Sequence, residues 1–123
     1  MHHRAHLGKE AEEKVADNLR SQGFKIVEQN YRKRHGEIDL IATKASLMVF
    51  VEVKMRQHQY FDLSDVITPS KQRKIISVAK EYIARKGTGN QSYRFDVALL
   101  QGTPQGLDVQ YIPNAFNEGD FSW

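Results

Sequence analysis

The fold of this chain is decided by Gly36-Glu37-Ile38-Asp39-Leu40-Ile41-Ala42 and, after a short polar turn, Val49-Phe50-Val51-Glu52-Val53-Lys54. Both segments are typical of buried strands, because β-branched and aromatic residues fill many of their positions. Each segment nevertheless carries ionisable groups, Asp39 in the first and Glu52 with Lys54 in the second. An ionised carboxylate is costly inside an apolar sheet unless a partner compensates its charge. These residues therefore indicate a role beyond folding.

The two segments are close enough in sequence to pair as an antiparallel hairpin through residues 44–46. Side chains alternate along a strand, so Glu52 and Lys54 share one face with Phe50, while the valines share the other. Because both faces are apolar, the second segment is predicted to be a central strand covered on both sides. The hairpin would bring Asp39 to about the level of Glu52.

A pair of carboxylates at this position favours a bound cation. Two carboxylates about 4 Å apart repel by roughly 4 kcal/mol at an effective dielectric of 20, so a shared cation or proton is needed to hold Asp39 and Glu52 together. Oxygen ligands in a chain without cysteine favour a hard ion, Mg²⁺ or Mn²⁺. Lys54 would lie beside it and orient an attacking water, and the carbonyl of Val53 would complete the coordination.

The rest of the chain supplies the surrounding elements. Helical periodicity predicts one helix from Leu7 to about Gln22 and a second that begins after the N-cap Thr68 and ends at Arg85 or Lys86. Strands are predicted at residues 24–31, 37–43, 47–54, 94–100 and 107–112, with a basic turn at 32–36 and a long surface loop at 55–68. The order helix, three strands, helix, two strands favours a mixed α/β domain around a single sheet of about five strands.

Length and composition limit the protein further. A chain of 123 residues fits one domain, residues 1–123, with a flexible tail at 1–6 that includes three histidines and a C-terminal extension at 113–123. The absence of cysteine is compatible with a reducing cytoplasm. Because no apolar run approaches the roughly 20 residues that span a bilayer, we expect a soluble cytoplasmic protein with no membrane partner.

One acid of the first helix is out of place. Glu12 falls in the middle of the apolar arc formed by Ala11, Val15, Ala16 and Leu19. If the helix packs over the sheet, Glu12 would point toward the same cleft and serve as a further metal or water ligand. A buried acid that pairs with a nearby Arg or Lys explains the position equally well.

Basic residues gather near the acidic motif. A net charge of +3 is by itself a weak indication of a polyanionic partner, but its distribution could form a groove that follows a nucleic-acid backbone. A solvated basic surface is the usual alternative. The residues predicted to contact nucleic acid are Arg32, Lys33, Arg34, His35, Arg56, Lys71 and Lys74.

Asp39 followed by Glu52-Val53-Lys54 resembles the active-site signature of the PD-(D/E)XK nuclease superfamily, and Glu12 is similar to the early helical acid of its Holliday-junction-resolvase-like branch. The chain also resembles the YraN-like family of small bacterial proteins over most of residues 7–100. This resemblance implies a restriction-endonuclease-like fold and a nuclease role. The matching stretches are Gly8 to Leu19, Asn30-Tyr31-Arg32, Gly36 to Ala42, Phe50 to Arg56, Thr68 with Lys71-Gln72, and Arg94-Phe95-Asp96-Val97.

Three hypotheses about function follow. The first is a Mg²⁺-dependent endonuclease that acts on DNA rather than RNA. It would select nucleic-acid structure and not sequence, because no segment reads base edges recognisably. A homodimer would provide two sites. The second is a nucleic-acid-binding module that keeps the fold and the acids without cutting. The third is protein interaction through the aromatic residues of the C-terminal stretch, Tyr111, Phe116, Phe121 and Trp123. Asp96 is either a supporting residue of the site or a partner of Arg94, and pairing is favoured.

Overall fold

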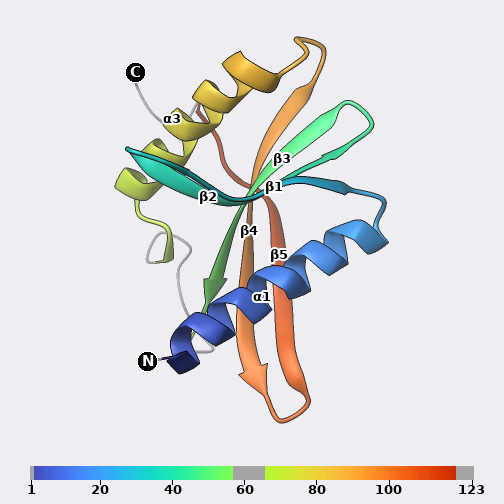
Figure 1. The fold of residues 1–123 in the computed structure, drawn as a ribbon, viewed down its shortest axis with the longest axis vertical. Coiled ribbons are helices and arrows are strands. Elements are labelled where there is room, and N and C mark those ends of the chain that lie inside the picture. Colours follow the sequence, from blue (N-terminus) through green and yellow to red (C-terminus); the bar gives the residue numbers. More distant parts are fainter. Residues whose placement is uncertain (1, 57–65, 119–123) are drawn as a thin grey trace.

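The protein is built on one mixed sheet of five strands in the order β1-β2-β3-β4-β5 (Figure 1). The computed structural model describes residues 2–56 and 66–118, with side chains from residue 8 onward. Neighbouring strands are antiparallel except β3 and β4, which are parallel. The strands are β1 (Lys25–Lys33), β2 (Gly36–Lys44), β3 (Leu47–Met55), β4 (Ser92–Thr103) and β5 (Gly106–Phe116).

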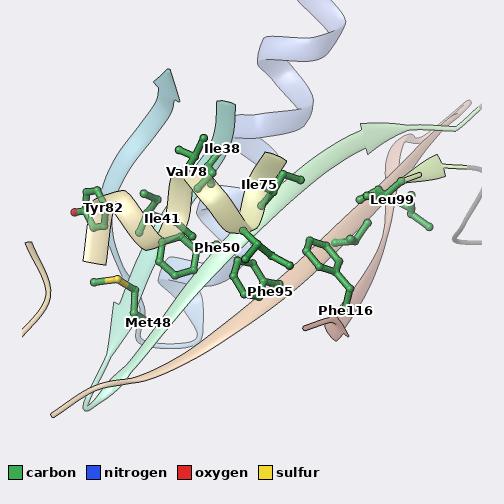
Figure 2. Close-up of a cluster of buried hydrophobic side chains, with 14 residues drawn as sticks. Ile38, Ile41, Met48, Phe50, Ile75, Val78, Tyr82, Phe95, Leu99 and Phe116 are labelled. Carbon is green, nitrogen blue, oxygen red and sulfur yellow. The ribbon is translucent and has the colours of Figure 1, made fainter. Parts of the chain in front are cut away.

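Two helices cover opposite faces of this sheet. Helix α1 (His2–Ser21) packs on one face, and helix α3 (Pro69–Lys86) lies on the other, within the connection between the parallel strands β3 and β4 (Figure 1). The α3-side core contains Ile38, Ile41, Met48, Phe50, Ile75, Val78, Tyr82, Phe95, Leu99 and Phe116 (Figure 2). The α1-side core contains Ala11, Val15, Ala16, Leu19, Leu40, Ala42, Val49, Val51, Ala98 and Leu100. As predicted, β3 is the central strand and is covered on both faces.

The ends of α3 follow the chemistry of its terminal residues. The side chain of Thr68 accepts a hydrogen bond from the backbone N–H of Lys71 at 3.2 Å, and proline occupies the first helical position. The backbone N–H of Gly87 donates to the carbonyl of Ile83 at 2.8 Å. A Cβ atom at Gly87 would lie 2.6 Å from that carbonyl oxygen, so the close turn at the helix end requires glycine. The predicted bounds of this helix are confirmed.

Several other bounds differ from the prediction. Helix α1 begins at His2 and not at Leu7, because no proline or glycine interrupts residues 2–7 and extending a formed helix costs little. The turn between β1 and β2 is limited to residues 34 and 35, since Arg32 and Lys33 continue the strand pairing. The predicted loop at 55–68 begins one residue later, because Met55 still belongs to β3, and residues 57–65 lie outside the described part of the chain.

The C-terminal stretch is also partly ordered into the sheet. Strand β5 continues to Phe116, whose ring stacks on that of Phe95 with centroids 5.2 Å apart. Tyr111 and Phe116 therefore contribute to the fold, which removes two of the four aromatic residues from the proposed interaction surface. The other two, Phe121 and Trp123, lie outside the described residues. No helix in the described ranges is long and apolar enough to cross a membrane.

Strand β2 changes its alternation at Asp39. Ile38 and Ile41 both belong to the α3-side core, whereas Leu40 lies in the α1-side core. Uninterrupted alternation would place Ile38 and Ile41 on opposite faces. The switch lies next to Asn30 of β1, which has a positive φ of 53°. Figure 1 shows the β1–β2 hairpin turning toward α3 while β3 continues in its own direction, so the sheet opens between β2 and β3 at this level.

Candidate functional site

Asp39 lies where β2 separates from β3. The last paired residues of these strands are Leu40 and Val51, and one step further Asp39 reaches the level of Glu52. The backbone N–H of Val53 donates to Oδ2 of Asp39 at 2.8 Å. The carboxylate of Asp39 therefore replaces a neighbouring strand as the partner of this amide, which holds Asp39 against β3.

Glu52 is one of two charged residues buried in the described part of the chain, and its exposed fraction is 6%. It lies on the face of β3 that carries Phe50, as the alternation predicts. Its carboxylate forms an ion pair with the ammonium of Lys71 on the first turn of α3. The sequence predicted Lys71 as a nucleic-acid contact and did not predict this partner.

Lys54 completes the group of residues that the sequence singled out. Its side chain is exposed at the end of β3 and borders the same hollow as Asp39 and Glu52. The hollow has a volume of about 500 Å³ and lies between the separating strands and the beginning of α3. Its lining consists of Gly36, Glu37, Asp39, Glu52, Val53, Lys54, Thr68, Ser70, Lys71, Lys74 and Ile75.

The surroundings of Asp39 favour its neutral form. Burial and the adjacent carboxylate of Glu52 raise the pKa of Asp39 to about 8, although the N–H of Val53 favours the charged form. Glu12 adds a smaller repulsion in the same direction. Two carboxylates that resist joint ionisation are a fitting place for a proton or a cation.

The residues present fit a hard divalent cation. Mg²⁺ usually keeps several waters and is held by one or two carboxylates together with substrate phosphates. Asp39 and Glu52 supply two carboxylates, and Val53 also lines the hollow. Among the side chains of residues 8–56 and 66–118, no group of three or more His, Asp or Glu could hold a metal. Asp39 and Glu52 could therefore hold such a cation together with substrate phosphates, without forming an all-protein cage.

Glu12 is near this site but is not part of its lining. Its Oε1 accepts a hydrogen bond from the side-chain amide of Asn30 at 2.9 Å. Burial raises the pKa of Glu12, and this hydrogen bond opposes the rise. The structure thus pairs Glu12 with an asparagine and not with the basic residue of the alternative, and its role as a metal or water ligand stays a prediction. Its charge still acts on Asp39 across the sheet.

The predicted nucleic-acid contacts separate into groups. Arg32, Lys33, Arg34, His35 and Lys74 line a second hollow that shares Gly36, Glu37 and Lys74 with the first. Lys71 and Lys74 lie at the first hollow itself. Arg56 follows the end of β3 and does not line either hollow. Its guanidinium donates a hydrogen bond to the side chain of Gln110 of β5 at 2.9 Å. Some of these charges already have partners: Arg32 pairs with Glu37, and Lys33 and His35 with Glu81.

Asp96 proves to be a partner of Arg94 and not a residue of the site. Its neighbours Phe95 and Val97 face α3, so Asp96 faces α1, away from the hollow. Its fully buried carboxylate accepts two hydrogen bonds from Arg94, at 2.8 and 2.9 Å. The backbone N–H of Asn114 and the hydroxyl of Tyr111 also donate to it.

Two features of the hollow were missed from the sequence. Thr68 and Ser70 line it, and Lys71 neutralises Glu52. The N-cap at Thr68 showed where the helix begins. The N-cap did not show which strand end lies opposite the first turn of the helix. The ion pair between Lys71 and Glu52 was therefore not predicted.

Comparison with known proteins places the chain among bacterial relatives. A protein of Alkaliphilus metalliredigens, named UPF0102 protein, is 40% identical over 112 residues, covering 89% of this chain and 96% of the relative. Its namesake in Hahella chejuensis is also 40% identical over 112 residues, covering 90% of each chain. A third, from Caldicellulosiruptor saccharolyticus, is 39% identical over 113 residues, covering 89% and 96%. Residues 11–100 match the Uncharacterised protein family UPF0102, and this chain therefore belongs to that family, the YraN-like family that its motifs resemble.

Proposed function

We propose that this protein is a metal-dependent nuclease that hydrolyses phosphodiester bonds of DNA. The observation that carries the proposal is the convergence of Asp39, Glu52 and Lys54 on one open hollow at the separation of β2 from β3. These residues belong to two strands, and folding alone gives no reason to gather two acids and a lysine there. The chain's resemblance to the PD-(D/E)XK signature points to the same chemistry.

The acids have the role of holding the cation. Asp39 and Glu52 would provide the carboxylate ligands and Val53 a backbone carbonyl. When bound, Mg²⁺ would place positive charge beside the phosphate and lower the pKa of the attacking water. The charge of Glu12 adds to the repulsion that a cation would relieve.

Lys54 has a different role. Its exposed ammonium at the end of β3 can donate hydrogen bonds both to a water and to a phosphate oxygen in the hollow. It would orient the water for attack and offset the negative charge that builds up on phosphorus during hydrolysis. Among the described residues Lys54 has no ion pair, so its charge is available to a substrate.

The neighbouring basic hollow suggests how the backbone would be bound. Arg34, His35 and Lys74 lie along a surface continuous with the acidic site, and each can contact the phosphates of any sequence. Such contacts hold any sequence in place, so we propose recognition by nucleic-acid structure and not by sequence. Cutting both strands of a duplex would require two copies of the chain.

The test is metal-dependent cleavage of labelled linear, nicked and four-way DNA in Mn²⁺. Glu52→Gln removes a proposed metal ligand and Lys54→Ala the residue that orients the water, so each should lower the rate by about 100-fold or more. The matched control is Glu13→Gln, since Glu13 is exposed on the outer face of α1. Far-ultraviolet circular dichroism checks that the variants fold. Cleavage by folded Glu52→Gln at the wild-type rate would refute the proposal.

A second candidate function is a nucleic-acid-binding module that does not cut. It is favoured by the ion pair between Lys71 and Glu52, because a built-in cation already satisfies one of the acids. Calorimetric titration with Mn²⁺ separates the two. Binding of DNA together with no heat of Mn²⁺ binding at millimolar concentrations would support the module, whereas saturable binding of Mn²⁺ that Glu52→Gln abolishes would support the nuclease.

A further inference from the structure

The position of Lys71 is not explained by the helix that carries it. Lys71 is the third residue of α3, and the first turn of that helix contains no acid. The partial positive charge of a helix N-terminus disfavours a cation there. Something outside the helix must compensate this placement, and the structure provides the carboxylate of Glu52.

The ion pair matters more for Glu52 than for Lys71. The side chain of Glu52 is 7% exposed, whereas that of Lys71 is 38% exposed. Water can therefore solvate the lysine but hardly the glutamate, so loss of the pair would leave the buried carboxylate without its counter-ion. Asp39 differs, since its oxygen is satisfied by the backbone N–H of Val53. Of the lysines that line the hollow, Lys71 is the one that pairs with a site carboxylate.

We propose that Lys71 is a positioning residue that serves as the counter-ion of Glu52 in the metal-free protein and competes with the divalent cation for it. The proposal rests on the proposed function, in which Glu52 is a metal ligand. Lys71 contacts Oε2 of Glu52, one of the two oxygens available to the cation. A cation that takes this oxygen displaces the ammonium. Lys71 keeps the empty site stable and lowers its affinity for metal.

The withdrawn ammonium has a place to go. Lys71 lies beside Ser70 and Lys74 in the lining of the open hollow, and Lys74 continues into the basic hollow. A phosphate that enters the hollow could then contact Lys71, because the lysine would no longer be paired with Glu52. Metal and nucleic-acid backbone would then bind cooperatively, because each takes one partner of the same ion pair.

The first test is Mn²⁺ binding alone, by calorimetry, without nucleic acid. Lys71→Gln should bind Mn²⁺ about tenfold more tightly than the wild type, since no ammonium has to be displaced. The matched control is Lys74→Gln, which removes the same charge from the same helix and the same hollow but has no ion pair with Glu52. It should raise the affinity much less. Equal effects of the two variants would show a general charge effect and overturn the proposal.

A conservative variant separates this role from a purely structural one. Lys71→Arg keeps a cation that can reach Glu52, and it should restore an affinity for Mn²⁺ near that of the wild type. If Lys71→Gln does not fold, Lys71→Met keeps the apolar stem and takes its place in the titration. Tight binding by Lys71→Arg as well as by the neutral variant would contradict competition through charge.

The second test measures cooperativity with DNA. In a Lys54→Ala background, which the proposed function expects not to cut, fluorescence anisotropy of a labelled duplex is compared in EDTA and in Mn²⁺. Mn²⁺ should increase DNA affinity with Lys71 present, and at least half of this gain should be lost in Lys71→Gln. An unchanged gain would overturn the release of Lys71 to phosphate. If neither the wild type nor Lys71→Gln binds Mn²⁺, the proposed function itself fails, whereas equal Mn²⁺ affinities refute only the inference.

Discussion

At the scale of single residues, Asp39 has the most unusual surroundings in the described part of the chain. It interrupts the alternation of β2, lies near Glu52 and accepts the N–H of Val53. Burial and Glu52 raise its pKa from the ordinary value of 3.8 to about 8. A buried acid beside a second carboxylate lowers the stability of the folded protein, and a bound cation would remove this destabilisation.

This cost predicts how stability depends on pH in the metal-free protein. Between pH 4 and 8 the folded state holds the proton of Asp39 and the unfolded state has released it, so the folded state binds more protons. The stabilising contribution is fully present below pH 4 and is lost as pH rises through 8. In EDTA, the free energy of unfolding should contain a term that falls by about 1 kcal/mol per pH unit in this window.

Denaturant unfolding at several pH values measures this effect. Asp39→Asn has no proton to release and should flatten the curve between pH 5 and 8, whereas Asp17→Asn, an exposed aspartate of α1, should leave the slope intact. The same slope in Asp39→Asn and the wild type would assign the pH dependence to other groups.

At the scale of elements, the β4–β5 pair depends on the buried carboxylate of Asp96. The register of the two strands shifts between Phe95 and Val97, and Asp96 fills this irregularity. Its carboxylate accepts a hydrogen bond from the backbone N–H of Asn114, a residue with a positive φ of 52°. This bond satisfies a backbone donor that the register shift leaves without a partner in the neighbouring strand. Strand β5 can then continue to Phe116.

Replacement of this carboxylate should weaken the sheet without touching the hollow. Asp96→Asn removes the charge that faces Arg94 and one of its acceptor oxygens, so we expect a loss of about 2 kcal/mol in the free energy of unfolding. Asp108→Asn on the exposed side of β5 should change stability by less than about 0.5 kcal/mol. Urea denaturation measures both. A matching midpoint for Asp96→Asn and the wild type would contradict this role.

At the scale of the whole molecule, the layered arrangement gathers acids and bases on the α3 side of the sheet. The separation of β2 from β3 opens the acidic hollow, and the β1–β2 hairpin brings its basic residues beside α3. The net charge of +3 is small, so any attraction for nucleic acid comes from this local arrangement and not from the overall field.

DNA binding should therefore depend on salt through a few identified residues. Arg34→Ala and Lys74→Ala should each weaken DNA binding and lower the slope of log K against log salt by about one, because each removes one phosphate contact. Lys14→Ala, on the exposed face of α1, removes an equal charge far from the hollows and should leave the slope unchanged. Fluorescence anisotropy in EDTA at several salt concentrations measures the slopes. Equal slopes for all four proteins would exclude the basic hollow as the binding surface.

Local patterns in the sequence determined the elements and the face on which each residue lies. Alternation along β3 predicted that Glu52 and Lys54 share the face of Phe50, and the capping residues predicted both ends of α3. The prediction was accurate there because the signal is local. A strand has a period of two, and a helix end requires particular residues within one turn. The acids of the hairpin were found for the same reason, since short turns fix the register of neighbouring strands.

The tertiary structure alone decided which distant side chains meet. The ion pair of Lys71 with Glu52, the hydrogen bond of Asn30 to Glu12 and the engagement of Asn114 by Asp96 join residues that are 18 or more positions apart. Such partners depend on how helices pack over the sheet and where strands separate or shift register. Those outcomes result from the packing of the whole core, and no short segment of the sequence contains them.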